Sequence, residues 1–73
     1  MTVAYEKGEW REAAEHYQKG VEIDRTNKEA FKNLGTALLQ IEDYEGAIEN
    51  FRKTIDIDPN ISAVYYNLGL ALS

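Results

Sequence analysis

Few side chains of this sequence could do chemistry, and they are scattered along it. His16 is the single histidine and there is no cysteine, so the usual imidazole and thiolate ligands of a metal site are missing. His16 stands between charged neighbours, which is typical of a solvated helix face. Ser62 and Ser73 have no base in a recognisable nucleophile arrangement, and no glycine-rich phosphate loop occurs. We therefore expect no catalytic residue, no metal site and no cofactor.

One stretch superficially resembles the start of a calcium-binding loop. Residues 56–62 read Asp-Ile-Asp-Pro-Asn-Ile-Ser, which places oxygen-bearing side chains at alternate positions. However, Ile61 stands where that loop needs glycine, and Asn67 stands where it needs a bidentate glutamate. Pro59 is better explained by a helix boundary. The many Asp and Glu residues elsewhere are expected to form solvated helix faces rather than acid–base pairs.

Length and charge limit the possible functions. The chain has 73 residues, enough for one small domain, and a formal net charge of −5. This charge argues against nucleic acid, whose phosphates are bound by clustered Lys and Arg, and weakly favours a neutral or basic partner. The longest uncharged stretch, residues 59–73, is too short and polar for a membrane span. The first residues do not resemble a signal peptide, so a cytoplasmic location is the default expectation.

The apolar residues recur with the spacing of amphipathic helices, and no segment alternates with the period of a strand. The sequence therefore predicts an all-α protein. Connections of two to four residues require neighbouring helices to run antiparallel. The predicted helices, the first of them short, span residues 2–7, 10–23, 28–41, 44–57 and 61–73.

Local signals mark the breaks between these helices. Thr26 and Glu29 fit a capping box at the start of the third predicted helix. Asp43 can cap the fourth helix, and Pro59 suits the first turn of the fifth. Gly8 and Glu9 lie 34 positions before Glu42 and Asp43, so we expect a corner between two helices there as well.

Residues 34 positions apart match along the chain. Asn-Leu-Gly at 33–35 returns at 67–69, and other identities and aromatic pairs follow the same offset. Such a period indicates one structural unit stacked on copies of itself. Within one unit, Gly35 and Ala47 are expected to face each other, so that two helix axes approach closely. A glycine inside a helix costs about 1 kcal/mol relative to alanine, which a close approach would offset.

The pattern resembles the tetratricopeptide repeat family. Residues 28–61 supply the matching residues in order: Phe31, Leu34, Gly35, Leu38, Ala47, Phe51 and Pro59. Residues 1–27 resemble the back part of an incomplete first repeat, and residues 62–73 the front part of an incomplete third. Arg25 departs from the pattern, because it stands where the family favours proline. The resemblance implies a right-handed α-solenoid of antiparallel helix pairs in a single domain, without catalytic activity.

The resemblance also implies a binding surface. In this family the first helix of each repeat lines a concave groove that holds a peptide or protein partner. The positions implied here are Glu29, Lys32, Asn33, Thr36, Gln40, Tyr66, Asn67 and Leu70. Asparagine amides can both donate to and accept from a peptide backbone, and Lys32 could meet a carboxylate. The alternative is that Asn33 and Asn67 are ordinary repeat residues that recur whether or not anything binds.

The family's clamp for carboxylate-ended chaperone tails is not expected, because Ala63 and Asn67 stand where that clamp has Lys and Arg.

A second hypothesis is self-association. The helix over 61–73 reads like an interior helix, yet no partner helix follows it in this sequence. Helix 10–23 of another copy could cover its apolar stripe by stacking or helix exchange. The residues expected to form this contact are Val64, Tyr65, Leu68 and Leu72.

Overall fold

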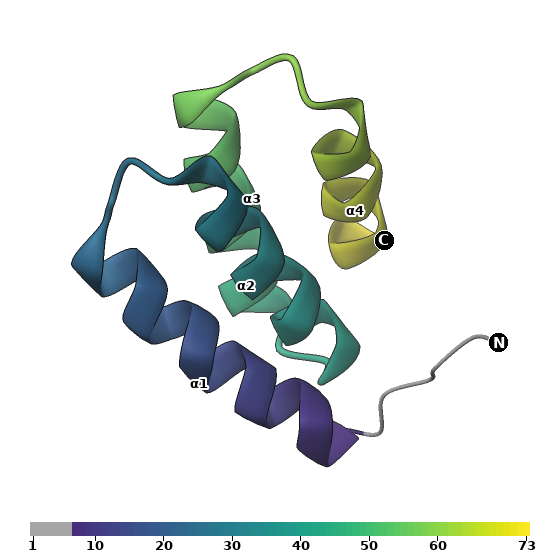
Figure 1. Cartoon of the computed structure of the whole chain (residues 1–73). Helices are drawn as coiled ribbons and strands as arrows, with labels where there is room; N and C mark the ends of the chain where they lie inside the picture. Colours follow the sequence, from purple (N-terminus) through teal and green to yellow (C-terminus); the bar gives the residue numbers. More distant parts are fainter. Residues whose placement is uncertain (1–6) are drawn as a thin grey trace, which may run out of the picture.

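The computed structural model describes residues 7–73 and contains four helices and no strand across that range. They are α1 (Lys7–Ile23), α2 (Lys28–Gln40), α3 (Tyr44–Ile57) and α4 (Ser62–Leu72). Each helix runs antiparallel to the next, and α2 lies between α1 and α3 (Figure 1). The all-α prediction is confirmed. The short helix predicted over 2–7 lies outside the described residues except for Lys7, which opens α1.

The corner predicted at residues 8–9 is wrong, because Gly8 and Glu9 lie in the first turn of α1. Nothing among the described residues forces a break there. A Cβ atom built on Gly8 would meet no atom within 4 Å, and the backbone of Gly8 has no positive φ. The negative charge of Glu9 also stabilises a helix that begins at Lys7, because the helix dipole is positive at its first turn.

The capping box predicted at Thr26 is also wrong. Asn27 caps α2 instead, and its side chain accepts the backbone amides of Glu29 at 3.1 Å and Ala30 at 3.4 Å. The Thr26 hydroxyl donates to the Asp24 carboxylate at 2.7 Å, and the Thr26 amide donates to the same oxygen at 3.0 Å. These bonds lower the pKa of Asp24. Thr26 thus bonds to Asp24 before the helix, and the side-chain cap of α2 comes from the next residue.

The turn between α2 and α3 is tight, and its predicted cap is confirmed. The Asp43 carboxylate accepts the amide of Gly46 at 3.1 Å. Just before it, Glu42 has a φ of 66°, a left-handed conformation that helix ends usually give to glycine. The Asp43 amide donates to the Leu38 carbonyl at 2.8 Å, which ties the turn back to α2.

The segment between α3 and α4 departs from the prediction for Pro59. This proline lies in the connection rather than in a first helical turn, because α4 begins at Ser62. The residue before α4 is Ile61, which offers no side-chain cap. The Tyr65 hydroxyl donates to the Pro59 carbonyl at 2.7 Å. This bond joins α4 to the connection before it, in place of a bond from an N-cap side chain.

An ion pair joins the two ends of the α2–α3 hairpin. The Lys28 ammonium at the start of α2 lies 2.6 Å from a carboxylate oxygen of Asp58, which follows α3. The other oxygen of Asp58 accepts the amide of Asn60 at 3.0 Å. Both contacts favour the charged carboxylate, so the Lys28 bond and then the Asn60 amide lower the pKa of Asp58. The same pairing raises the pKa of Lys28.

The contact between α2 and α3 depends on the absence of a side chain at Gly35. A Cβ atom there would lie 2.6 Å from a ring carbon of Phe51, which is fully buried. The predicted close approach of the helices is thus confirmed, but the nearest side chain is Phe51 and not Ala47. Helical side chains lean toward the N-terminus of their own helix, which carries the Phe51 ring back over the turn that contains Ala47.

The buried side chains form two clusters. The first joins α1 to α2, and its buried members are Ala14, Val21, Phe31, Leu34 and Ala37. The second joins α3 to α4, and its buried members are Ala47, Phe51, Val64 and Ala71. Leu38, which is half-buried on α2, packs against both clusters.

Two buried polar side chains of α3 are satisfied locally. The Thr54 hydroxyl donates to the Asn50 carbonyl at 2.9 Å, and the Asn50 amide donates to the Gly46 carbonyl at 2.8 Å. Because each bond stays within the helix, neither Thr54 nor Asn50 leaves an unpaired polar group in the core.

Gly35 and Gly69 are repeat equivalents in different surroundings, so the same substitution should have opposite effects. Gly35→Ala should lower the free energy of unfolding by about 1–3 kcal/mol, because the new methyl group overpacks against Phe51. Gly69→Ala meets no atom within 4 Å and should raise it by up to about 1 kcal/mol. Urea unfolding followed by circular dichroism measures both; equal effects of the two changes would contradict the assigned packing.

The Lys28–Asp58 pair should make stability depend on pH in two windows. The folded pKa of Asp58 is depressed, so its contribution is present above its unfolded pKa of about 3.9 and is lost as pH falls through the folded value. The folded pKa of Lys28 is raised, so its contribution is present below about 10.4 and is lost as pH rises through the folded value.

The variant Asp58→Asn should therefore lose less stability than the parent chain between pH 7 and pH 2, as measured by urea midpoints. Asp56→Asn is the matched control, because Asp56 is exposed on the preceding turn and is in none of the ion pairs found among residues 7–73. The pairing has no effect on stability if the two variants show the same acid dependence.

Candidate functional site

The predicted groove residues fall on α2 and α4, two helices that contact each other (Figure 1). Asn33 on α2 and Asn67 on α4 are repeat equivalents, and both side chains are half-buried. Tyr66 and Leu70 extend from α4 with 70% and 46% of their surface exposed. Asn67 thus follows directly after the exposed Tyr66 on α4, and Asn33 lies on the helix that α4 contacts.

The amides of Asn33 and Asn67 are available for a ligand. No hydrogen bond found among residues 7–73 uses either side chain. An asparagine amide offers two donors and an oxygen with two lone pairs, so each can serve both a carbonyl and an amide of a bound backbone. Half-burial also restricts their rotamers, which reduces the entropy lost when a ligand binds.

Other predicted groove residues are already engaged within α2. The Lys32 ammonium lies 2.7 Å from the Glu29 carboxylate, and this bond lowers the pKa of Glu29. The Thr36 hydroxyl donates to the Lys32 carbonyl at 3.0 Å. Gln40 is exposed at the last residue of the helix. Lys32 would have to leave Glu29 to meet a carboxylate of a ligand, so its charge is not freely offered.

The residues predicted for self-association have different environments. Val64 is fully buried against α3, and Leu68 is half-buried in the same cluster. Tyr65 and Leu72 are exposed, Leu72 by 58%. The space beside Gly69 is open. Val64 thus serves the core of its own chain, and the surface left for a second copy consists of Tyr65, Leu72 and part of Leu68.

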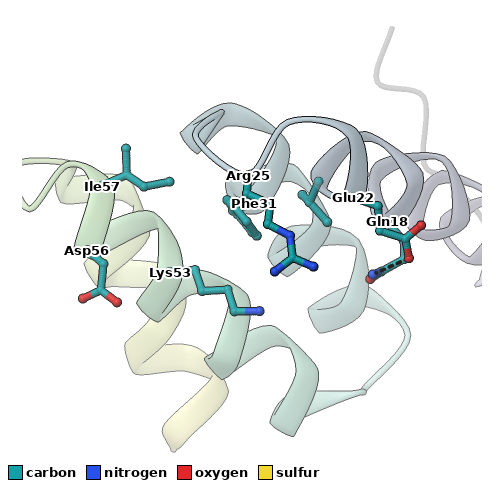
Figure 2. A pocket seen from close by; sticks show the side chains of 8 residues that line it. Gln18, Glu22, Arg25, Phe31, Lys53, Asp56 and Ile57 are labelled. Atoms are coloured by element: carbon teal, nitrogen blue, oxygen red, sulfur yellow. Dashed lines mark hydrogen bonds between the residues drawn. The ribbon is translucent and has the colours of Figure 1, made fainter.

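The structure also contains a hollow that the sequence did not predict. It has a volume of about 340 Å³ and lies between the C-terminal halves of α1 and α3 (Figure 2). Its apolar residues are Val21, Phe31 and Ile57, and the cations Arg25 and Lys53 line it as well. None of the predicted groove residues takes part. The available signal was Arg25, which occupies the position that Pro59 holds one repeat later.

The stretch that resembles a calcium loop is used for structure. The Asp58 carboxylate binds Lys28 and the amide of Asn60, as described above. Within residues 7–73 no group of three or more His, Asp or Glu residues is arranged to hold a metal ion. No helix in that range is long and apolar enough to cross a membrane.

Comparison with family models identifies the repeats. Residues 29–61 match the model described as tetratricopeptide repeat, and residues 3–42 match one described as TPR repeat. The chain belongs to the tetratricopeptide repeat family. A comparison with curated proteins found no match. The two family-model matches confirm the family resemblance predicted from residues 28–61. Tetratricopeptide repeats are in general protein–protein interaction modules and typically non-catalytic scaffolds.

Proposed function

We propose that the chain is a non-catalytic module that binds an extended peptide segment of a partner protein across α2 and α4. The observation that carries this proposal is the pair Asn33 and Asn67. These side chains are repeat equivalents on neighbouring helices, are half-buried, and make no hydrogen bond with residues 7–73. A half-buried amide without a partner gains more from a ligand than a fully solvated one.

The mechanism is recognition of the backbone by amides on a rigid surface. Asn33 and Asn67 would each donate to a carbonyl and accept from an N–H of the bound segment. Tyr66 and Leu70, both largely exposed, would supply apolar area for its side chains. Because α2 is held by the Gly35–Phe51 contact and by the Asn27 cap, and α4 by its buried Val64 and Ala71, little ordering cost falls on the module.

The charges of this surface favour an uncharged or basic segment. Lys32 is the cation among the proposed groove residues, and Glu29 already neutralises it at 2.7 Å. The formal net charge of −5 adds a field that repels acidic partners at low salt. We also propose a cytoplasmic setting, for which the absence of cysteine is weak support.

The double variant Asn33→Ala/Asn67→Ala should weaken peptide binding at least about thirtyfold, because it removes four proposed hydrogen bonds that contribute roughly 0.5–1.5 kcal/mol each. The ligand would be a peptide selected from a random library on the parent chain, and calorimetry would measure its affinity. Asn60→Ala is the matched control, since this exposed asparagine lies in the α3–α4 connection. N-methylation of the peptide backbone should mimic the loss.

Unchanged affinity in the double variant would reject the amide mechanism. Equal weakening by Asn60→Ala would also reject it, because the effect would then not depend on the α2–α4 surface. Circular dichroism of each variant separates loss of binding from loss of fold.

Self-association is a second candidate, favoured by the distribution of exposed apolar residues. Of the seven large apolar residues exposed among residues 7–73, four lie on α4: Tyr65, Tyr66, Leu70 and Leu72. Gly69 also leaves open the space that Phe51 fills beside Gly35. Tyr17 of a second copy is the repeat equivalent of Phe51 and could occupy that space, which would place α1 of one chain against α4 of another.

Leu72→Glu should abolish such association, because it places a charge on the exposed α4 surface without removing a buried side chain. Sedimentation over a wide concentration range would show oligomers for the parent chain and monomers for this variant. Gln40→Glu is the control, since it places the same charge on the proposed peptide surface of α2, outside α4, and should leave the oligomers intact. A parent chain that sediments as a monomer at every concentration rules out this candidate.

A further inference from the structure

The hollow between α1 and α3 combines an apolar floor with two cations. Phe31 of α2 and Val21 of α1 are buried residues that still line it, and Ile57 at the end of α3 is partly exposed beside them. Its volume of about 340 Å³ is within the range of roughly 300–1,000 Å³ that is typical of ligand pockets. The hollow can therefore admit a side chain and not only water.

The charged groups around the hollow are arranged by sign. In Figure 2 the charged ends of Arg25 and Lys53 extend toward the same space beside Phe31. The Asp56 carboxylate is directed away from Lys53, and the Glu22 carboxylate accepts the Gln18 amide at 3.3 Å. The two lining carboxylates thus leave the space between the cations to a ligand.

Neither cation is strongly neutralised by the described part of the chain. No ion pair found in residues 7–73 uses Arg25. The Lys53 ammonium has a loose contact of 3.4 Å with Glu49 and lies 5.7 Å from the centre of the Phe31 ring. In a chain whose acidic residues outnumber its basic ones by 13 to 8, two converging cations are unusual. An anion placed between them would relieve their mutual repulsion.

We propose that this hollow, here called the α1–α3 site, binds an acidic side chain of a partner protein together with a neighbouring apolar side chain. The carboxylate would bridge Arg25 and Lys53, and the apolar group would rest on Phe31, Val21 and Ile57. In an extended segment, residues two positions apart lie on the same side. An acidic and an apolar residue separated by one residue therefore match the site.

The exposure of the cations favours a protein segment over a free carboxylate. Half of the Lys53 side chain is exposed, and an exposed ion pair changes an equilibrium constant by no more than about fivefold. Two such pairs cannot hold a small free acid at millimolar concentration. A segment that also buries an apolar side chain on Phe31, Val21 and Ile57 gains the further affinity that brings its binding into the millimolar range.

The α1–α3 site shares no residue with the proposed peptide surface on α2 and α4. The preferred ligands also differ in charge, since the α2–α4 surface favours uncharged or basic segments. One chain could thus hold two different segments at once.

The test is a magnetic resonance titration of the full chain with N-acetyl-Leu-Ala-Glu-amide, with N-acetyl-Leu-Ala-Gln-amide as the matched probe. Glutamate should shift the Arg25 side-chain N–H and the Phe31 ring signals, and glutamine should not. Arg25→Gln and Lys53→Gln should each weaken binding about threefold to fivefold. Arg52→Gln is the control, because Arg52 is exposed next to Lys53 but does not line the site.

Three results would overturn the proposal: no shift with the glutamate probe, equal shifts with both probes, or equal weakening by Arg52→Gln. The last would indicate non-specific attraction. Because Arg25 and Lys53 are exposed, their variants should keep the helical spectrum of the parent chain, so a loss of binding can be read directly. Asn33→Ala/Asn67→Ala should leave this titration unchanged, which separates the α1–α3 site from the peptide surface.

Discussion

The structure depends on one contact, the Phe51 ring packed against the bare backbone of Gly35. It brings α2 and α3 together more closely than two ordinary side chains would allow. That distance determines where the Lys28–Asp58 pair can close the open end of the hairpin, and where the Leu38 carbonyl can receive the Asp43 amide at the other end. It also sets the positions of α1 and α4, because each packs on one side of this hairpin.

Periodicity predicted most of the fold, because the positions of apolar residues on a helix are a property of the sequence itself. The centres of the helices and the cap at Asp43 follow from that and from local chemistry. Two of the errors concern which of two neighbouring side chains makes a given contact. Asn27 rather than Thr26 caps α2, while Thr26 bonds to Asp24, and Phe51 rather than Ala47 faces Gly35. Such outcomes depend on side-chain directions that spacing alone does not give.

The two candidate sites also differ in how much of each the sequence indicated. The residues of the α2–α4 surface come from the family resemblance, and their role in binding stays a prediction. The sequence did not reveal that Val64 would be buried in its own core or that Lys32 would bind Glu29. For the α1–α3 site the sequence offered Arg25 at a position where the family favours proline, but that departure alone did not indicate a pocket. The site arises because Arg25 and Lys53, from separate segments, extend toward the same space, and no sequence motif records that convergence.

The two buried clusters have a consequence for how the chain unfolds. In stacked repeats, stability is approximately a sum of terms for each unit and for each interface between neighbours. Here α1 and α4 have no extensive contact with each other. The unfolding of one can therefore destabilise the other only through the α2–α3 hairpin. Leu38 packs against both clusters and so contributes directly to that coupling. The cooperativity of the described helices therefore rests on the α2–α3 hairpin, because α1 packs on α2 and α4 packs mainly on α3.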